Sequence, residues 1–410
     1  MSGSLPPDSL PFEGIKVADF SWVGVGPTST KYLADHGATV VRVETSNPLD
    51  ILRVAGPFKD NVPGPDRTQF FAEFNTSKLG LTLDLKNPAG VAVARRLIAW
   101  ADVYAESFTP GTVDSLGIGY EVARSLNPSI IMASTCLMGQ TGSAAGFAGF
   151  GFHAGSIAGY YEITGWPDLP PDGPWTAYTD TIAPRFLSAT IMAALDHRRR
   201  TGQGQHIDAA QIEIGLHFLA PQIIDYRVSG RTVSRNGNRS ETAAPHGAYP
   251  CEGEDQWCAI AIQSEDQWAA LRRTMGDPPW AGDARFQNPE GRLAHQDEID
   301  GHLAQWTRGK PPREVTELLQ AEGVPAGMVQ RSSDLLQDPQ LAHRRFFRYL
   351  DHQEMGSIPY GGHQFRISGY DSGPRYPAPV LGQHNEQVLR EVLGMTDEEI
   401  GEAIIAGALG

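Results

Sequence analysis

The chain has 410 residues, more than one hydrophobic core usually organises, so we expect two domains. Hydrophobic residues make up 40% of the chain and charged residues 20%, which is typical of a globular protein and not of a disordered one. The formal net charge of −15 repels phosphate backbones, so the composition disfavours nucleic-acid binding while remaining compatible with a small anionic ligand.

Several further classes are disfavoured by simple patterns. The three cysteines, Cys136, Cys251 and Cys258, form no C-x-x-C pair, so we expect a reducing cytoplasm. The 12 histidines are scattered and no H-E-x-x-H motif occurs, which predicts no metal site. The opening "MSGSLPPDSLPF" lacks the basic and apolar regions of a signal peptide. No run approaches the roughly 20 apolar residues of a membrane helix.

The first half of the chain alternates between strand-like and helix-like patterns. Helical patterns at 27–37 and 87–101 separate stretches rich in β-branched and apolar residues. We expect the strands within residues 15–23, 38–44, 79–85, 102–108 and 127–135. This alternation predicts βαβ units and therefore an α/β fold, a Rossmann-like parallel sheet with helices on both faces.

The pattern changes after residue 202. "GAYPCEGEDQWCAIAI" alternates on both sides of "EGED", which predicts a hairpin, and Ser264 with Gln267 three residues on has the pattern of a capping box. We expect a large domain at 1–224, a smaller α+β domain at 225–340, and a C-terminal segment at 341–410 that returns to the large domain.

A glycine turn, "WVGVGPTST", follows the first strand. Gly24 and Gly26 stand between strand and helix, and Glu44 lies 20 residues beyond Gly24, at the end of the next strand. This is most of a dinucleotide-binding fingerprint, but Ser29 replaces the third glycine. The turn is compatible with NAD, with a plain strand-to-helix connection, and with another phosphate-bearing ligand at the helix N-terminus.

The stretch "AYTDTIAPRF" places Asp180 beside the start of a helix. Pro184 fits a first helical turn. Apolar side chains at helical spacing then mark a buried face: Phe186, Leu187, Ile191, Ala194 and Leu195. Asp180 can cap this helix. Alternatively, held ionised with a lowered pKa and surrounded by water-excluding aromatic residues, it can attack an acyl group. Spacing does not separate these interpretations.

Several motifs together resemble those of the family III CoA-transferases, which include formyl-CoA:oxalate and carnitine CoA-transferases. The resemblance runs from about residue 10 to the C-terminus. Its motifs are "GIKVADFSWVGVGPTSTKYLADHGATVVRVE", "FNTSKLGLTLDLKNPAG", "ADVYAESFTPGTVDSLGIGYE", "AALDHRRRTGQGQHID", "APHGAYP", "EGVPAGMV", "DPQLAHRRFF" and "APVLGQHNEQVL". Each is loose alone, and their order along the chain is what is specific.

The resemblance implies a chemistry. The aspartate matching Asp180 is the family's nucleophile, which forms an anhydride and then an aspartyl-CoA thioester, with coenzyme A thioesters as substrates and no permanently bound cofactor. The CoA-binding positions that it implies are Val23, Gly24, Thr45, Asn75, Lys78, Ser107 and Phe108. Thr45 and Ser115 stand where some members carry arginine, so we expect Lys78, Arg53 or Arg42 to meet the ADP phosphates. Lys78 and Arg42 are alternatively solvated surface charges.

Racemases of α-methylacyl-CoA share the fold that the resemblance implies. They pair the aspartate with a histidine from an upstream "G-H-D" and with glycines after the aspartate. Here Gly149 falls near the histidine position and "TIAPRF" follows Asp180, which disfavours a racemase. His153 is a second catalytic group or a satisfied helix histidine, and we place it with Tyr178 in the substrate pocket. Two more functions stay open at this point: a non-catalytic acyl-CoA-binding partner subunit and an NAD-dependent oxidoreductase.

The family also implies an interlocked dimer, with the active site between the large domain of one chain and the small domain of its partner. The partner is a second copy or a related subunit, and we expect a cytoplasmic protein that binds neither nucleic acid nor membrane. "GYYEITGWPDLPPDGPWTAYTDTIAPRF" resembles the branch that contains benzylsuccinate-type transferases. Its aromatic residues suit a bulky or aryl acid, or an ordinary core. Succinyl-CoA is the donor that we expect.

Overall fold

The computed structural model describes residues 9–410, so most of the opening segment examined for a signal peptide lies outside the described residues. The chain divides into two compact units. The large unit comprises the described residues up to 161, residues 173–232 and residues 342–410, and the small unit comprises residues 162–172 and 233–341. The small unit therefore starts at 233, where we expected 225, and it takes in a segment that precedes Asp180.

The large unit is built on one parallel sheet of six strands, in the order β3-β2-β1-β4-β5-β6. The strands are β1 Lys16–Phe20, β2 Thr39–Glu44, β3 Leu79–Thr82, β4 Val103–Glu106, β5 Ile131–Cys136 and β6 Gln205–Ala210. This is the strand order of the doubly wound dinucleotide-binding fold, which confirms the Rossmann-like expectation. The chain turns in opposite directions after β1 and β4, so a crevice opens between their carboxyl ends.

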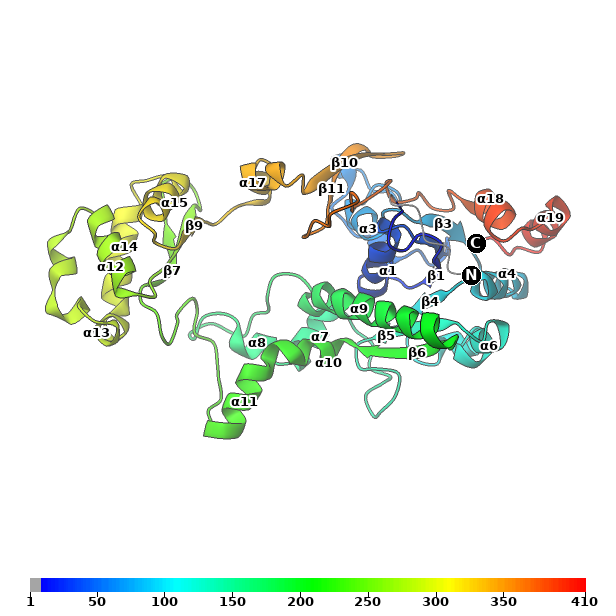
Figure 1. Cartoon of the computed structure of the whole chain (residues 1–410), viewed down its shortest axis with the longest axis horizontal. Helices are drawn as coiled ribbons and strands as arrows, with labels where there is room; N and C mark the ends of the chain where they lie inside the picture. Colours follow the sequence, from blue (N-terminus) through cyan, green and yellow to red (C-terminus); the bar gives the residue numbers. More distant parts are fainter. Residues whose placement is uncertain (1–8) are drawn as a thin grey trace. The chain divides into compact units, whose positions relative to one another are not determined.

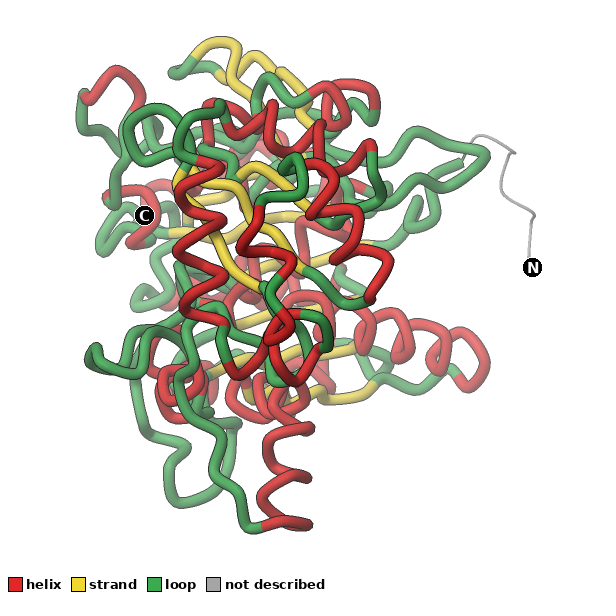
Figure 2. The backbone as a smooth tube through the Cα atoms, turned by 90° about the vertical axis from the view of Figure 1, so that its left-hand side faces the viewer, coloured by secondary structure: helices red, strands yellow, loops and turns green. Residues whose placement is uncertain are grey.

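Helices cover both faces of the sheet. On one face α1 (Val25–Asp35) and α9 (Tyr178–Thr201) pack over Val17, Val40 and Ile131 (Figure 1). On the other, α4 (Pro88–Trp100) and α6 (Tyr120–Leu126) pack over Ala18, Val41 and Met132. Neighbouring strand residues thus point into two different cores, as the alternation of side chains along a strand requires. Figure 2 shows the yellow strands among red helices.

The remaining elements of the large unit connect these layers. They are α2 Ile51–Val54, α3 Gln69–Phe74, α5 Thr112–Ser115, α7 Gly151–Ile157, the first half of α8 Tyr160–Ile163 (whose last two residues belong to the small unit), α10 Gln211–Leu216, α11 Ala220–Ser229, the hairpin of β10 Phe347–His352 and β11 Gly356–Gly361, α18 Asn385–Gln387 and α19 Asp397–Ile405.

The C-terminal segment covers the free edge of the sheet. The Gly80 N–H donates to His384 Nδ1 at 3.0 Å, and the Thr82 N–H donates to Asn385 Oδ1 at 2.9 Å. These side chains occupy the backbone donors that an edge strand otherwise exposes to another chain.

The small unit is an antiparallel sheet of three strands with helices. Its elements are β7 His246–Pro250, β8 Trp257–Ala261, β9 Ala326–Met328, α12 Glu265–Thr274, α13 Pro289–Ala294, α14 Gln296–Thr307, α15 Pro312–Ala321, α16 Ser332–Leu335 and, reaching its last residues, α17 Pro339–His343. The predicted hairpin is confirmed by the pairing of β7 with β8. The Ser264 hydroxyl accepts the Gln267 N–H at 3.3 Å, as its capping pattern predicts.

Helix α9 departs from its prediction in two ways. It begins at Tyr178, so Pro184 lies inside the helix and not in its first turn. Because proline has no N–H, the Asp180 carbonyl lacks the donor that a helix normally supplies four residues later. Phe186 was expected on the buried face but is 39% exposed, because its ring packs 5.9 Å from His217 and 6.0 Å from Phe218, away from the sheet.

Among residues 9–410, no helix combines the length and apolar character needed to cross a membrane.

Candidate active site

The turn after β1 lies at the crevice between β1 and β4. The Trp22 N–H donates to Ser107 Oγ at 2.8 Å, and the Ser107 hydroxyl returns a hydrogen bond to the Trp22 carbonyl at 3.1 Å, which ties the two strand ends together. Val23 follows with φ of 64°, a left-handed conformation that is rare for a β-branched residue. The chain then enters α1 at Gly24.

Asp180 is packed between two glycines. A Cβ atom at Gly24 would lie 3.3 Å from the Asp180 Cβ, and a Cβ at Gly151 would lie 2.7 Å from both its Cγ and its Oδ1. Only glycine permits such an approach at Gly151. Gly24 is the N-cap of α1 and Gly151 the first residue of α7, so the carboxyl group faces the N-termini of two helices besides its own.

Burial raises the pKa of Asp180 to about 6, and a hydrogen bond from the Gly151 N–H opposes only part of that effect. Our expectation of a lowered pKa is therefore wrong, because the loss of water around the carboxylate outweighs the favourable helix termini. The capping interpretation is also wrong, since Ala177 occupies the N-cap of α9.

Two cavities of the large unit meet at Asp180. The first, which we call the crevice cavity, has a volume of about 150 Å³ and is lined by residues 22–25, 107–110, 135–137 and 147–150 with Asp180 and Gln211. The second, which we call the helix groove, has a volume of about 410 Å³ and runs between α1 (28–35) and α9 (180–192), with Glu73, Phe74 and residues 361–365 completing it. A reacting group at Asp180 is therefore accessible from two sides.

The structure gathers part of the predicted site around the crevice cavity. Val23, Gly24, Ser107 and Phe108 line it together with Asp180. The other predicted residues do not line this cavity. Three of them have the following surroundings. Tyr178 packs against the ring of Tyr160 at 5.1 Å, exposed His153 accepts the Phe150 N–H through Nδ1 at 3.1 Å, and the Thr45 hydroxyl accepts the Asn47 N–H at 3.2 Å within its own turn.

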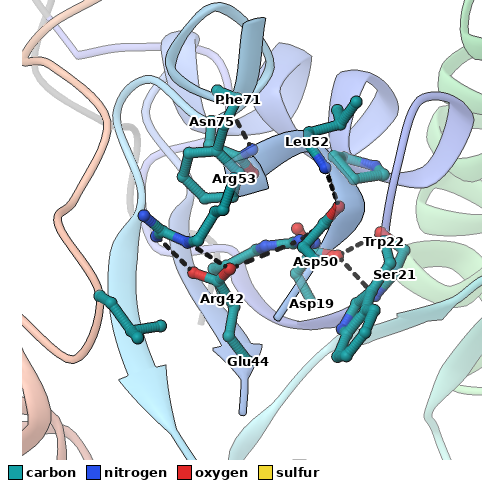
Figure 3. Close-up of polar contacts among 12 residues, drawn as sticks. Asp19, Ser21, Trp22, Arg42, Glu44, Asp50, Leu52, Arg53, Phe71 and Asn75 are labelled. Atoms are coloured by element: carbon teal, nitrogen blue, oxygen red, sulfur yellow. Dashed lines mark hydrogen bonds and ion pairs between the residues drawn. The ribbon is translucent and has the colours of Figure 1, made fainter. Parts of the chain in front are cut away.

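The four other predicted CoA residues belong to one buried charge cluster beside β1, β2 and β3. Figure 3 shows the part of this cluster around Arg42, Arg53 and Asn75. Arg42 Nη2 lies 2.5 Å from Asp50 Oδ2, and both side chains are fully buried. Arg53 binds Glu44 through two hydrogen bonds, of 2.8 and 2.7 Å, and lies over the ring of Phe71. Glu44, the acid of the dinucleotide fingerprint, is thereby occupied by an internal ion pair.

Lys78 and Asn75 belong to the same cluster. The Lys78 ammonium donates to Asp19 Oδ2 at 2.9 Å, to Asn75 Oδ1 at 2.9 Å and to the Pro27 carbonyl at 2.8 Å, which uses all three of its donors. Like Arg42, Lys78 is 0% exposed, so the alternative that these two residues are solvated surface charges is wrong.

The cluster is ionised although it is buried. Burial lowers the pKa of Lys78 to about 8, against the attraction of Asp19. Burial alone would raise the pKa of Asp19, but Lys78, Arg42 and two hydroxyl groups together hold that pKa below its ordinary value. The pKa of Arg42 is raised, because Glu44 and Asp50 outweigh its burial.

Sequence reasoning missed Asp50 and Gly151. Asp50 precedes a short helix in "LDILR" and its Oδ1 accepts the Leu52 N–H at 3.0 Å, so a capping signal was present but gave no indication of the contact with Arg42. Gly151 carries no signal, because its importance comes from a side chain on a different helix. Within the described part of the chain, no group of three or more His, Cys, Asp or Glu is arranged to hold a metal ion.

The doubly wound sheet, with a half-buried carboxyl group beside a cavity at its strand-end crevice, is the arrangement of α/β enzymes that bind ligands at the switch point. The sequence model of CoA-transferase family III matches residues 12–385, and the chain belongs to this family, as its motifs led us to expect.

Curated relatives and a solved structure agree with this assignment. The chain is 31% identical to succinyl-CoA–D-citramalate CoA-transferase of Chloroflexus aurantiacus, over 98% of both chains, and 32% identical to succinate–glutarate CoA-transferase of Agrobacterium fabrum, over 95% of this chain and 97% of that one. The crystal structure of a CAIB/BAIF family protein from Brucella suis superposes with a TM-score of 0.86 at 30% identity, covering 94% of this chain and 100% of that one. The protein is a CoA-transferase, which exchanges CoA between acyl-CoA thioesters and acids.

We predict that Gly151→Ala lowers the CoA-transfer rate by about 100-fold, because a displacement of the reacting group by about 1 Å has a cost of that order. The matched control is Gly155→Ala in the same helix, where a Cβ would lie 3.5 Å from Tyr161 in ordinary contact. Both variants are to be compared with the wild type by steady-state transfer and by thermal unfolding. Wild-type turnover in a folded Gly151→Ala variant would show that this packing of Asp180 is not required.

Proposed function

We propose that the protein transfers CoA from a donor acyl-CoA to a carboxylic acid through covalent intermediates on Asp180. The observation that carries this proposal is the half-buried Asp180 carboxyl group, packed between Gly24 and Gly151 and reached from both cavities. With a pKa of about 6 it is mostly ionised at neutral pH, and it is poorly hydrated, which favours nucleophilic attack.

The cycle consists of four acyl transfers. An Asp180 oxygen attacks the donor thioester carbon, the C–S bond breaks, and CoA leaves as a thiolate from a mixed anhydride. The thiolate then attacks the Asp180 carbonyl carbon, which releases the donor acid as a carboxylate and leaves an aspartyl-CoA thioester. The acceptor carboxylate attacks this thioester and forms a second anhydride. The thiolate finally attacks the acceptor carbonyl, which gives the new acyl-CoA and restores the Asp180 carboxylate.

No step of this cycle requires a proton, so the reaction does not need a general acid or base. This fits the surroundings of Asp180, because His153 is exposed and bonded to the backbone of its own helix. What the cycle does need is stabilisation of oxyanions at the attacked carbons. The N-termini of α1 and α7, which both face Asp180, supply free backbone N–H groups and favourable dipoles there.

We place the thiol end of CoA in the crevice cavity. Val23, Gly24, Ser107 and Phe108 line it, and the switch point of a doubly wound sheet is where such folds bind their ligands. Arg42, Arg53, Asn75 and Lys78 are bonded within the buried cluster, so we now assign them to support of the site and not to direct contact with the ADP phosphates. Contact of Thr45 with CoA stays a prediction.

We place the acid in the helix groove. Two of its lining residues are cations: Lys31 is paired with Asp35 at 2.5 Å, whereas the Arg185 guanidinium donates to the Thr181 carbonyl and has no carboxylate partner among the described residues. The rise along α9 from Asp180 to Arg185 is about 7.5 Å. A chain of four or five carbons, at about 1.5 Å per bond, spans a comparable length.

This geometry favours a dicarboxylic acid whose distal carboxylate binds Arg185. It agrees with the names of the relatives, which act with succinyl-CoA and D-citramalate or with succinate and glutarate. We therefore propose succinyl-CoA as donor and a dicarboxylate as acceptor. An aryl acid, which the aromatic residues before Asp180 suggested, is the alternative.

The interlocked dimer also stays a prediction, and one face of the large unit supports an association. Helix α11 has no buried residue. Its exposed apolar side chains are Ile223, Ile224, Tyr226 and Val228. Such a face is unusual on a monomer and suits an interface between copies of the chain or with a related subunit.

We predict that incubation with succinyl-CoA and hydroxylamine inactivates the enzyme and converts Asp180 to a hydroxamate, which peptide mass spectrometry detects. Asp180→Asn has no nucleophilic oxygen anion and is expected to be inactive and unlabelled. A racemase would instead exchange the α-hydrogen of a 2-methylacyl-CoA without an acid acceptor, and a partner subunit would bind CoA with neither reaction. Full turnover of Asp180→Asn would rule out the proposed role.

The labelling rate is expected to depend on pH with a limb near 6. Asp180 reacts as the carboxylate, and its pKa is raised to about 6 by burial, so the rate falls as the pH drops through about 6 and levels off above 7. An ordinary aspartate would keep its full rate down to about pH 5. A limb near 4 would show that Asp180 is hydrated when it reacts.

We predict that Arg185→Gln lowers the ratio of kcat/KM for glutarate over kcat/KM for pentanoate by at least about tenfold, the low end of a charged hydrogen bond. Arg200→Gln, exposed on the same helix and paired with Asp196, is the matched control. The readout is a panel of acids, with each new thioester identified by mass. Preference of the wild type for an aryl acid, or an unchanged ratio in Arg185→Gln, would contradict this assignment.

We predict that the chain sediments as a dimer and that Ile224→Asp together with Val228→Asp releases monomers. Ile405→Asp, at an apolar side chain of α19 that is 89% exposed, controls for the added charge. A monomeric, fully active wild type would contradict the association.

A further inference from the structure

The turn between β1 and α1 is held in a conformation that its sequence does not favour. Val23 has a φ of 64°, and a β-branched residue adopts this value only where its surroundings enforce it. The next residue, Gly24, is the one that approaches Asp180. Whatever enforces the turn therefore also determines one wall of the reaction site.

Asp50 accepts the backbone N–H of this strained residue, whose side chain packs against the apolar cluster around Leu52 and Phe71. Its Oδ2 accepts the Val23 N–H at 3.2 Å and lies 2.5 Å from Arg42 Nη2, while its Oδ1 accepts the Leu52 N–H at 3.0 Å (Figure 3). Asp50 is 0% exposed, so water does not compete for these oxygens. With donors fixed on both oxygens, the carboxylate has one orientation, and the Val23 N–H must point toward it.

The other end of the turn is anchored separately. Lys78 donates to the Pro27 carbonyl at 2.8 Å, and the Thr30 hydroxyl donates to Asp19 at 2.7 Å, so the first turn of α1 is fixed to the sheet. Gly24 lies between this anchor and the one at Asp50. Loss of the Asp50 contact therefore frees Val23 to return to an extended or right-handed conformation while α1 stays in place.

We propose that Asp50 is a positioning residue of the CoA-transfer reaction, which acts by holding Val23 in the left-handed conformation and so keeping Gly24 against Asp180. This inference rests on the proposed nucleophilic role of Asp180. Arg42, which sequence reasoning assigned to CoA phosphate, holds the Asp50 carboxylate in one orientation through this ion pair.

An amide at position 50 separates this role from simple charge balance. Asparagine offers one acceptor oxygen where the carboxylate offers two, so its NH₂ group faces either the Leu52 N–H or the donors of Arg42 and Val23. In either orientation a donor opposes a donor, and the hold from both sides on position 50 is lost. Asp50→Asn also leaves Arg42 as a buried charge without this partner, which destabilises the fold. Adding Arg42→Met removes that charge, so the double variant R42M/D50N regains stability without regaining the contact with Val23.

The experiment compares the rate of Asp180 labelling by succinyl-CoA, per folded protein, in four chains. We expect D50N to be about 100-fold slower than the wild type, and R42M/D50N to be more stable than D50N but equally slow. The matched control is Glu44→Gln, which breaks the ion pair with Arg53; Glu44 also lies 4.0 Å from Arg42 but accepts no hydrogen bond from the turn. It is expected to lose stability and keep its rate. Recovery of the rate together with stability in R42M/D50N would overturn the proposal.

Glycine at position 23 gives an independent arm, because glycine adopts positive φ without strain. Adding Val23→Gly to D50N is expected to raise the labelling rate at least tenfold over D50N, although no contact to position 50 is restored. Failure of this rescue would show that the conformation of Val23 is not what Asp50 supplies.

A structural readout keeps the inference separate from the proposed function. If the wild type is never labelled, the nucleophilic role of Asp180 fails, and hydrogen exchange at the Val23 amide then tests the hold by itself. We expect the Val23 amide to exchange faster in D50N than in E44Q. If D50N does not fold, R42M/D50N replaces it in this comparison, with the same expected result. Equal protection of this amide in these variants would contradict the role of Asp50.

Discussion

The close packing of the Asp180 carboxyl group against two glycines is the constraint on which the proposed site depends. The group is packed so closely that a Cβ at Gly151 would lie 2.7 Å from it, and burial raises its pKa to about 6. Such packing needs backbone without side chains on two sides, which the starts of α1 and α7 supply. It also needs the turn before α1, in which Val23 adopts a conformation that valine disfavours. Because Asp50 binds this turn, the geometry at Asp180 is linked to the buried charge cluster.

The buried charges are better explained by the backbone segments that they hold in place than by a contribution to the stability of the fold. A buried ion pair loses in desolvation much of what it gains in attraction, so its contribution to stability is small. Here, however, several members also bind backbone. Asp50 accepts the Val23 N–H, Lys78 donates to the Pro27 carbonyl, and Arg53 donates to the Pro379 carbonyl at 3.2 Å. Asp66, which is paired with Arg53 at 2.6 Å, accepts the Leu381 N–H at 2.9 Å. The cluster thus fixes the crevice turn and the returning C-terminal segment in one arrangement.

The fold could be predicted from the sequence because the patterns that indicate strands and helices are local. Strands buried on both faces appear as continuous apolar runs, and the helices between them keep their own period, so the parallel sheet follows without tertiary information. The site was only partly predictable, for the opposite reason. In the sequence, Arg42 and Lys78 look like surface charges, because their partners Asp50 and Asp19 lie in other segments of the chain. Likewise, the position of Asp180 in a helix suggests a lowered pKa, and only the structure shows that burial raises it instead. The start of α9 was misplaced because a proline fits a first turn well but is also tolerated within a helix, where its missing N–H leaves the carbonyl four residues earlier without that donor.

The raised pKa of Asp180 fits a proposed reaction that moves no protons. In the proposed cycle the thioester energy passes through two anhydrides and an aspartyl thioester, each of which water would destroy. A strong base beside Asp180 would activate water as readily as it would assist transfer, so a site without such a base is an advantage. A carboxylate with a pKa of about 6 meets the remaining need, because it is charged at neutral pH and yet loses little hydration when it attacks. The two cavities then have different roles, since the thiolate must stay near Asp180 in the crevice cavity while the acids exchange in the helix groove. Because Gly24 has no side chain, α1 does not cover the Asp180 carboxyl group, and the thiolate and the acids can reach the same carbon.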